Sequence, residues 1–173
     1  HRAMTMAAVG AVLFALGESP RLLERIRTSS IPEGRGNRIS CGHVSLIDDS
    51  YNANPESMRA ALEVLSGSAG GRRIAVLGDM LELGEDSTNY HRELNTHMDG
   101  IDGVVCVGKQ MQALAACLDH ERRLNYFERA DQGLIDYLLS VTQTGDVLLV
   151  KGSRGIFWSQ GFVASLKDAF DDA

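Results

Sequence analysis

The sequence is poor in cysteine, in proline and in long apolar segments. Its 173 residues include three cysteines and three prolines. Cys41, Cys106 and Cys117 are odd in number and show no Cys-x-x-Cys spacing, which argues against a disulfide framework and against a structural zinc site. No apolar run reaches the roughly 20 residues that a membrane-spanning helix needs. We therefore expect a protein of the reducing cytoplasm that neither relies on disulfides nor binds a membrane.

Positive charge is scarce as well. The chain has 17 Lys and Arg residues against 23 Asp and Glu residues, a formal net charge of -6, which is the wrong sign for a general nucleic-acid binder. Residues 1–40 nevertheless carry six Arg and three Glu, so the acidic excess lies in the remainder of the chain. With 44% hydrophobic residues and no low-complexity tract, most of the chain should fold. The shift in charge indicates two pieces of different origin.

The first residue is His1 and not Met, which indicates a fragment or a processed product. The apolar stretch 3–17, with small residues near its end, has two interpretations. It can be a signal peptide, or it can be a small-residue helix that packs against a domain outside this sequence. We prefer the helix.

Beyond that stretch, short β-rich runs alternate with helical patterns. Helices are predicted at 3–16 and 20–27, and 31–37 is dense in Pro and Gly, as in a linker or a ligand loop. Strands are then predicted at 44–47, 73–77, 104–107, 124–127 and 147–150, and helices at 55–66, 87–98, 109–118, 131–141 and 158–170. This alternation predicts an α/β fold: an open, mostly parallel, Rossmann-like sheet of five or six strands with helices on both faces, preceded by a short helical remnant of another domain.

Polar clusters follow four of the predicted strands. In an open parallel sheet, ligands bind beyond the carboxyl ends of the strands, which all lie at one edge. The clusters should therefore share that edge and form a binding site, although turns collect Gly, Asp and Asn for purely structural reasons. They are Asp48–Asn54, Gly78–Asp79, Gly108–Lys109 and Lys151–Arg154.

No common motif explains these clusters. Gly103–Gln110 is similar to a P-loop, but it lacks Ser or Thr after its Lys, and its central residues are predicted to form a strand. Asp48–Arg59 imitates a calcium loop, but it has Ala53 in place of the required Gly and Arg59 in place of the required Glu. There is no Gly-x-Gly-x-x-Gly and no Ser-His-Asp or Cys-His grouping. His91 and His97, six residues apart on one predicted helix, are expected to be surface or helix-packing residues.

Three segments together resemble a known family. Ile47–Met58 (IDDSYNANPESM), Val76–Gly84 (VLGDMLELG) and Val150–Arg154 (VKGSR) resemble the C-terminal half of the Mur ligases, in the family's order and spacing. Pro32–Arg35 is similar to the stretch that precedes the C-terminal domain there. The resemblance implies that residues 1–36 are the C-terminal tail of the central ATPase domain plus a linker, and that residues 37–173 are the Mur ligase C-terminal domain.

The resemblance implies part of an ATP-dependent carbon-nitrogen ligase of peptidoglycan synthesis, in the branch that joins UDP-MurNAc-tripeptide to D-Ala-D-Ala. In that family ATP converts the tripeptide carboxylate into an acyl phosphate, which the amine of D-Ala-D-Ala attacks. The phosphate-binding loop, the Mg²⁺ ligands and a carbamylated lysine lie in the central domain. We therefore expect no catalytic residue and no metal ligand in these 173 residues, which should be inactive alone. We also expect a monomer.

The resemblance further implies ligands for individual residues. Arg35 would reach the ATP phosphates, as suits its planar donor fork, Asp49 would accept hydrogen bonds from the ribose, and Tyr51 would lie beside the nucleotide. D-Ala-D-Ala would be held by Asn52, Asn54, Asp79, Lys151, Ser153 and Arg154, with Arg154 or Lys151 on its carboxylate and Asp79 on its ammonium group. Arg2 and Thr5 stand where the family has asparagines that contact adenine.

Two alternatives remain open. A phospho-receiver signalling domain also has an acidic pair after its first strand and a Lys after its last, as Asp48, Asp49 and Lys151 do. It needs, however, an acceptor Asp after the third strand, where this chain has Gly108, and Asp79 comes one strand too early. The other alternative is a standalone α/β domain that binds a small molecule.

Overall fold

The computed structural model describes residues 2–25 and 32–173. The chain divides into two compact units, residues 1–31 and 32–173, and each is described by itself. The first contains helix α1 (Arg2–Ala15) and a 3-10 helix, η1 (Pro20–Arg25). Both lie where helices are predicted, but residues 26 and 27 of the second prediction and residue 31 of the predicted loop lie outside the described residues, as do the side chains of Arg2 and Thr5. In the part of the chain that the structure describes, no helix is long and apolar enough to cross a membrane.

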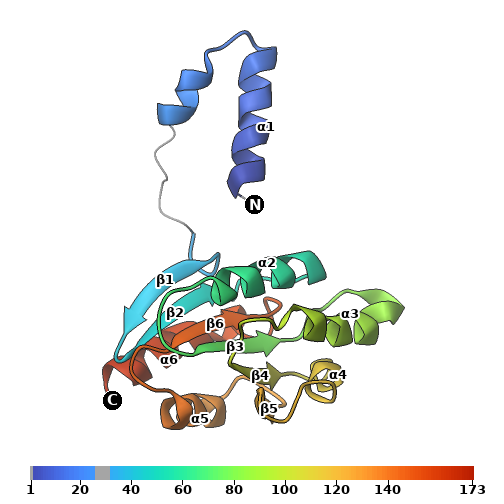
Figure 1. Cartoon of the computed structure of the whole chain (residues 1–173), viewed down its shortest axis with the longest axis vertical. Coiled ribbons are helices and arrows are strands. Elements are labelled where there is room, and N and C mark those ends of the chain that lie inside the picture. The colour runs from blue at the N-terminus through green and yellow to red at the C-terminus, as the bar shows by residue number, and fades with distance from the viewer. Residues whose placement is uncertain (1, 26–31) are drawn as a thin grey trace. The chain divides into compact units, whose positions relative to one another are not determined.

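The second unit is built on a six-stranded sheet in the order β1-β2-β6-β3-β4-β5 (Figure 1). The strands are β1 (Asn37–Cys41), β2 (Val44–Asp49), β3 (Arg73–Gly78), β4 (Gly103–Val107), β5 (Arg123–Phe127) and β6 (Val147–Lys151). All neighbouring strands are parallel except β1 and β2, which form an antiparallel hairpin. The expected open, mostly parallel α/β sheet is confirmed. The sequence prediction missed β1, because this edge strand turns only Ile39 and Cys41 toward the core.

The helices connect the strands. They are α2 (Pro55–Ser66), α3 (Ser87–Glu93), α4 (Gln112–Ala115), α5 (Gln132–Val141) and α6 (Phe162–Asp171), with shorter 3-10 helices η2 (Gly84–Asp86), η3 (Leu94–His97) and η4 (Trp158–Gln160). Three predictions differ in detail: 87–98 is divided into α3 and η3, 109–118 keeps a single turn of α-helix, and 158–170 is interrupted at Gly161.

Helix α2 begins sharply because its first residues satisfy their own backbone groups. The side chain of Asn54 accepts a hydrogen bond from the backbone N–H of Ser57 at 2.8 Å, and the Ser57 hydroxyl accepts one from the N–H of Asn54 at 3.0 Å. Pro55 occupies the first turn, where a missing N–H costs nothing. This capping box fixes where the chain turns from the end of β2 into the helix.

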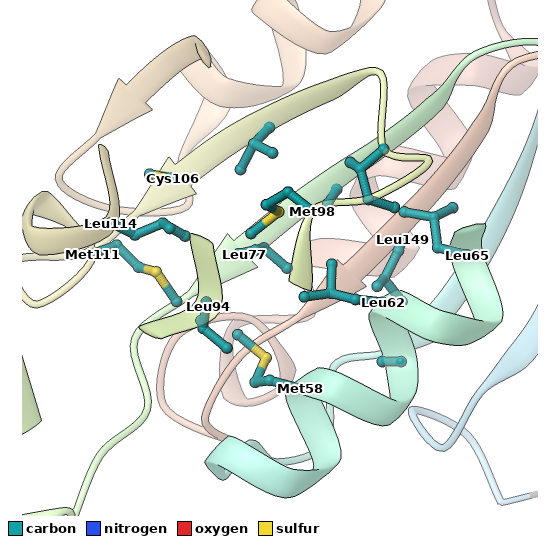
Figure 2. Close-up of a cluster of buried hydrophobic side chains, with 14 of the residues drawn as sticks. Met58, Leu62, Leu65, Leu77, Leu94, Met98, Cys106, Met111, Leu114 and Leu149 are labelled. Carbon is teal, nitrogen blue, oxygen red and sulfur yellow. The ribbon is translucent and has the colours of Figure 1, made fainter. Parts of the chain in front are cut away.

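The core lies on both faces of the sheet, because successive side chains of a strand point to opposite faces. Ala75 and Leu77 of β3 belong to a cluster with α2, η3 and α4, whereas Ile74 and Val76 belong to a cluster with α5 and α6. Figure 2 shows the first cluster, in which side chains of α2 lie over Leu77 and the neighbouring strand β6. The central runs 74–77 of β3 and 147–150 of β6 are therefore apolar on every residue, as the sequence predicts.

The order of the strands creates a topological switch point in the sheet. The helices that follow β2 and β3 pack on one face, whereas α6, which follows β6, packs on the other. Because β6 lies between β2 and β3, the chain leaves neighbouring strands in opposite directions. In open α/β sheets, ligands generally bind near such a switch point, beyond the carboxyl ends of the strands.

At the opposite edge of the sheet, Asp146 holds together the segments that enter β3 and β6. Its Oδ2 lies 2.7 Å from Nη2 of Arg72 and accepts the backbone N–H of Gln143 at 2.9 Å, while its Oδ1 accepts the N–H of Arg72 at 3.1 Å. Burial alone would raise the pKa of Asp146, but the hydrogen bonds from Arg72 and Gln143 outweigh it and hold the pKa below its ordinary value.

We predict that Asp146→Asn destabilises the fold by roughly 2 kcal/mol at pH 7, the range of hydrogen bonds to charged groups. Since the pKa of Asp146 is lowered by folding, its contribution is complete above the unfolded pKa, about 4, and disappears as the pH falls through the folded value. Urea unfolding at pH 7 and between pH 4 and pH 2 should therefore show the two proteins converging in acid. Asp119→Asn, at an exposed pair with Arg122, is the control and should show no comparable convergence.

Candidate functional site

The four polar clusters meet at the carboxyl edge of the sheet, as expected. Lys151 at the end of β6 is the register partner of Asp49 at the end of β2 and of Leu77 near the end of β3. Gly78 in turn pairs with Val107 at the end of β4. The loops that follow these strands therefore start side by side, although they are up to about a hundred residues apart in the sequence.

Lys151 is a buried cation at the centre of this edge. Its side chain is 2% exposed, and its Nζ lies 2.7 Å from Oδ2 of Asp49 and donates to the carbonyl of Asn52 at 2.9 Å. Burial raises the pKa of Asp49, against the opposing effect of Lys151. Lys151 thus ties the loop after β2 to the end of β6, and this geometry favours a structural role for it over the expected contact with a substrate carboxylate.

Asp48 anchors the segment that carries Arg35. Its Oδ2 accepts the backbone N–H of Gly34 at 3.0 Å, its Oδ1 accepts hydrogen bonds from the N–H and hydroxyl of Ser50, and its carbonyl accepts the N–H of Gly36 at 2.7 Å. The N–H of Tyr51 also donates a hydrogen bond to the carbonyl of Gly34 at 3.0 Å. The sequence places Asp48 in a polar cluster and in an acidic pair, but nothing in its local pattern predicts a partner 14 residues earlier.

The ring of Tyr51 contacts two arginines and a tryptophan. The guanidinium carbon of Arg35 lies 4.2 Å from the centre of the Tyr51 ring, and that of Arg154 lies 5.5 Å from it. Trp158 meets the same ring edge-on with a centroid distance of 5.5 Å. Gly34 fits only because it has no side chain: a Cβ there would lie 2.7 Å from the Trp158 ring, and its φ is +72°. The structure therefore brings Arg35 and Arg154 to one aromatic platform.

Asp79 is enclosed by the next loop. Asp79 is 5% exposed, and its Oδ1 accepts the N–H of Met111 at 2.8 Å. Gly108 lies against its carboxylate so closely that a Cβ would fall 2.4 Å from the carboxyl carbon, and φ of Gly108 is +106°. The carbonyl of Asp79 accepts the N–H of Ser153. This enclosure favours a structural role for Asp79 over contact with an ammonium group, and equally over phosphorylation.

The loop after β3 has a partner that sequence analysis did not assign. His91 of α3 is fully buried, its Nε2 accepts the N–H of Met80 at 2.9 Å, and its Nδ1 lies 2.7 Å from the carbonyl of Ser87. A proton on Nδ1 satisfies both contacts. The hydroxyl of Ser153 accepts the N–H of Leu81 at 2.8 Å. His91 and Ser153 thus fix this loop from two sides, and only the tertiary packing of α3 distinguishes His91 from the exposed His97.

The two asparagines of the loop after β2 remain at the surface. The side chain of Asn54 caps α2, and Asn52 hydrogen-bonds the N–H of the following Ala53 through its own Oδ1 at 2.9 Å. Both residues are exposed, and an amide offers two donor hydrogens besides its acceptor oxygen. They can therefore bind a ligand without giving up these contacts.

A pocket of about 340 Å³ opens beside Trp158, between β1 and the η4–α6 segment. It is lined largely by apolar groups, and its charged residues are Glu33, Asp48 and Lys167. Neither the two arginines nor Lys151 line it. Residues 2–25 and 32–173 contain no group of three or more His, Cys, Asp or Glu side chains that could hold a metal ion.

Comparison with known proteins gives a consistent result. Residues 34–154 match the family model described as "Mur ligase, glutamate ligase domain". The chain is 47% identical over 114 residues to the UDP-N-acetylmuramoyl-tripeptide–D-alanyl-D-alanine ligase of Escherichia coli. This alignment covers 63% of this chain and 24% of that protein.

Solved structures agree. The crystal structure of MurF from Acinetobacter baumannii superposes with a TM-score of 0.82 at 29% identity, over 97% of this chain and 37% of that one. The MurF ligase from Thermotoga maritima in complex with ADP superposes with a TM-score of 0.77 at 25% identity, over 94% of this chain and 36% of that one. The chain spans about a quarter to a third of the length of the curated relatives it matches.

We predict that Lys151→Met destabilises the fold by roughly 3 kcal/mol, because it leaves the Asp49 carboxylate without its cation in a desolvated place. Urea unfolding measures the loss. The double variant Lys151→Met, Asp49→Asn should recover part of it, since no charge is then left unpaired.

The matched control is Lys167→Met, which removes an exposed pair with Asp171 and should cost less than about 1 kcal/mol. Equal losses of stability for Lys151→Met and Lys167→Met would contradict the stabilising role of the buried Lys151–Asp49 ion pair.

Proposed function

This chain belongs to the Mur ligase family, through its glutamate ligase domain, and from that membership we propose that it is the C-terminal part of a UDP-N-acetylmuramoyl-tripeptide–D-alanyl-D-alanine ligase. The observation that carries the proposal is the meeting at one sheet edge of the three family-like segments Ile47–Met58, Val76–Gly84 and Val150–Arg154. Because the three segments meet in the fold, a single binding site can account for the family-like sequence of all three. In this proposal residues 1–36 are the end of an ATPase domain with its linker, and 37–173 are the closing domain.

The proposed reaction forms an amide at the cost of ATP. The terminal phosphoryl group of ATP passes to the tripeptide carboxylate, which gives ADP and an acyl phosphate. The amine nitrogen of D-Ala-D-Ala then attacks the acyl carbon, the carbon–oxygen bond to phosphate breaks, and the nitrogen loses a proton. An acyl phosphate is needed because an oxide is a poor leaving group from a carboxylate. Mg²⁺ would serve the phosphates, and because the described residues offer it no ligand cluster, we assign it to another part of the ligase.

The first proposed role of this chain is nucleotide binding. Asp49 is well suited to the ribose, since its side chain is 25% exposed and its two oxygens can accept both from Lys151 and from a hydroxyl. Arg35 is exposed and held above Tyr51, so its guanidinium can reach a phosphate when the domains close. Tyr51 supports Arg35 in this arrangement, which leaves less of its ring for the nucleotide.

The part played in binding D-Ala-D-Ala falls to the exposed groups. Asn52, Asn54 and Arg154 are accessible at the carboxyl edge. Lys151, Ser153 and Asp79 are buried and engaged with other loops, so in this proposal they shape the site without touching the dipeptide. A reaction that consumes ATP and a UDP-linked precursor belongs in the cytoplasm, and we retain this localisation and a monomeric state as part of the proposal.

A chimaeric enzyme tests the function. The C-terminal part of the Escherichia coli ligase is replaced by residues 34–173 of this chain, and formation of UDP-MurNAc-pentapeptide is followed by mass spectrometry with ATP, Mg²⁺, UDP-MurNAc-tripeptide and D-Ala-D-Ala. We expect product from the chimaera and none from the 173 residues alone or from the truncated Escherichia coli protein alone. A folded chimaera that makes no product, or product from this chain by itself, would contradict the proposal.

We also predict that Asp49→Ala in the chimaera raises the KM for ATP by roughly tenfold, the value of one hydrogen bond to a charged group, and raises the KM for D-Ala-D-Ala by clearly less. Steady-state kinetics with each substrate varied in turn measure both constants. Asp86→Ala, at an exposed residue of η2, is the matched control. An unchanged dependence on ATP would rule out the ribose contact.

A further inference from the structure

Arg35 and Arg154 come from different ends of the domain but share one support. Arg35 belongs to the segment before β1 and Arg154 to the loop after β6, yet both guanidinium groups lie over the ring of Tyr51, at 4.2 and 5.5 Å from its centre. The distance between the two guanidinium carbons is therefore at most the sum of these two lengths. A tyrosine ring attracts cations through its negative face, which lowers the cost of bringing two like charges together.

Neither arginine forms a direct ion pair within the described part of the chain, although Arg35 lies near enough to Asp49 to oppose the effect of burial, which raises the pKa of that carboxyl group. Among the described residues, the ion pairs involve Arg72, Arg73, Arg122, Lys151 and Lys167, but not Arg35 or Arg154. The carboxylates closest in sequence to Tyr51 are already engaged, Asp48 by the backbone of Gly34 and Ser50, and Asp49 by Lys151. Both arginines are exposed. Two exposed positive charges that no direct ion pair neutralises favour an anion from solution.

The support is rigid. Two backbone hydrogen bonds and the Asp48 carboxylate hold Gly34 and Gly36 on either side of Arg35, and Trp158 packs against both Gly34 and Tyr51. Arg154 is followed by a turn in which its carbonyl accepts the N–H and the hydroxyl of Ser159. The backbones of both arginines are thus fixed before any ligand arrives, which reduces the entropy lost on binding.

We propose that Arg35 and Arg154 form a single anion-binding site, with Tyr51 as its platform, that holds one phosphate group between two guanidinium forks. A carboxylate has two oxygens and one negative charge, and one bidentate arginine satisfies it, whereas a terminal phosphate offers three oxygens and a charge near -2, which two arginines match. The inference rests on the proposed function for the identity of that phosphate, the terminal group of ATP. It moves Arg154 from the dipeptide to the nucleotide.

Binding of inorganic tripolyphosphate to the 173-residue chain, measured by calorimetry, tests the site without ligase activity. We expect Arg35→Gln and Arg154→Gln each to weaken binding by about tenfold, and the double variant to lose less than the product of the two, because the arginines act on one group. Tyr51→Phe should retain binding and Tyr51→Leu should weaken it. Arg59→Gln and Arg129→Gln, at exposed residues elsewhere, are the controls and should bind as the original chain does.

The proposal is overturned if the original chain does not bind tripolyphosphate, if Arg154→Gln binds it unchanged, or if the two control variants weaken binding as much. Circular dichroism confirms that each variant is folded. Failure of this site and failure of the ligase function are separable. A chimaera that makes no pentapeptide while the arginine pair still binds tripolyphosphate refutes the function alone, and an active chimaera in which Arg154→Gln raises only the KM for D-Ala-D-Ala refutes the shared site alone.

Discussion

The parallel pairing of β6 between β2 and β3 is the constraint on which the site depends. This register sets Lys151 beside Asp49, and their ion pair closes the carboxyl edge of the sheet at its centre. Although α6 leaves β6 on the face opposite to α2 and α3, the loops after β2, β3 and β6 are hydrogen-bonded to one another at this edge. The meeting of the polar loops at this edge is thus a consequence of strand order, and their charged groups are held by the same backbone ladder that stabilises the fold.

Polar residues at this edge divide into two classes by burial. Asp48, Asp79, Lys151 and His91 are buried, and each is hydrogen-bonded to the backbone of another segment. A buried polar group without partners would cost more than it contributes, so these groups are best explained as the fixings that join loops. Arg35, Arg154, Asn52 and Asn54 are exposed on the loops so fixed. Ligand contacts are thereby separated from the groups that position them.

The sequence predicts best those structural features whose cause lies within a few neighbouring residues. The boundaries of α2 follow from Asn54, Pro55 and the spacing of its apolar residues, all within a few positions. Helix α3 was predicted too long because apolar spacing continues into η3, where the backbone tightens. Strand β1 was missed because Arg38 and Ser40, two of its five residues, are exposed and only Cys41 is buried. The expected site residues lie at the expected edge, but residue type alone does not separate Lys151, which is buried, from Arg154, which is exposed.

By itself, the sequence determined the alternation of strands and helices, the family, and the set of polar segments that follow the strands, because periodicity, capping and motif spacing are properties of neighbouring residues. Tertiary structure alone decided which of those polar side chains are enclosed and which face solvent. That decision depends on pairings across the chain, such as Asp48 with Gly34, His91 with Met80, and Arg35 with Arg154 over Tyr51. Burial and charge pairing are set by contacts between distant segments, which no local pattern contains.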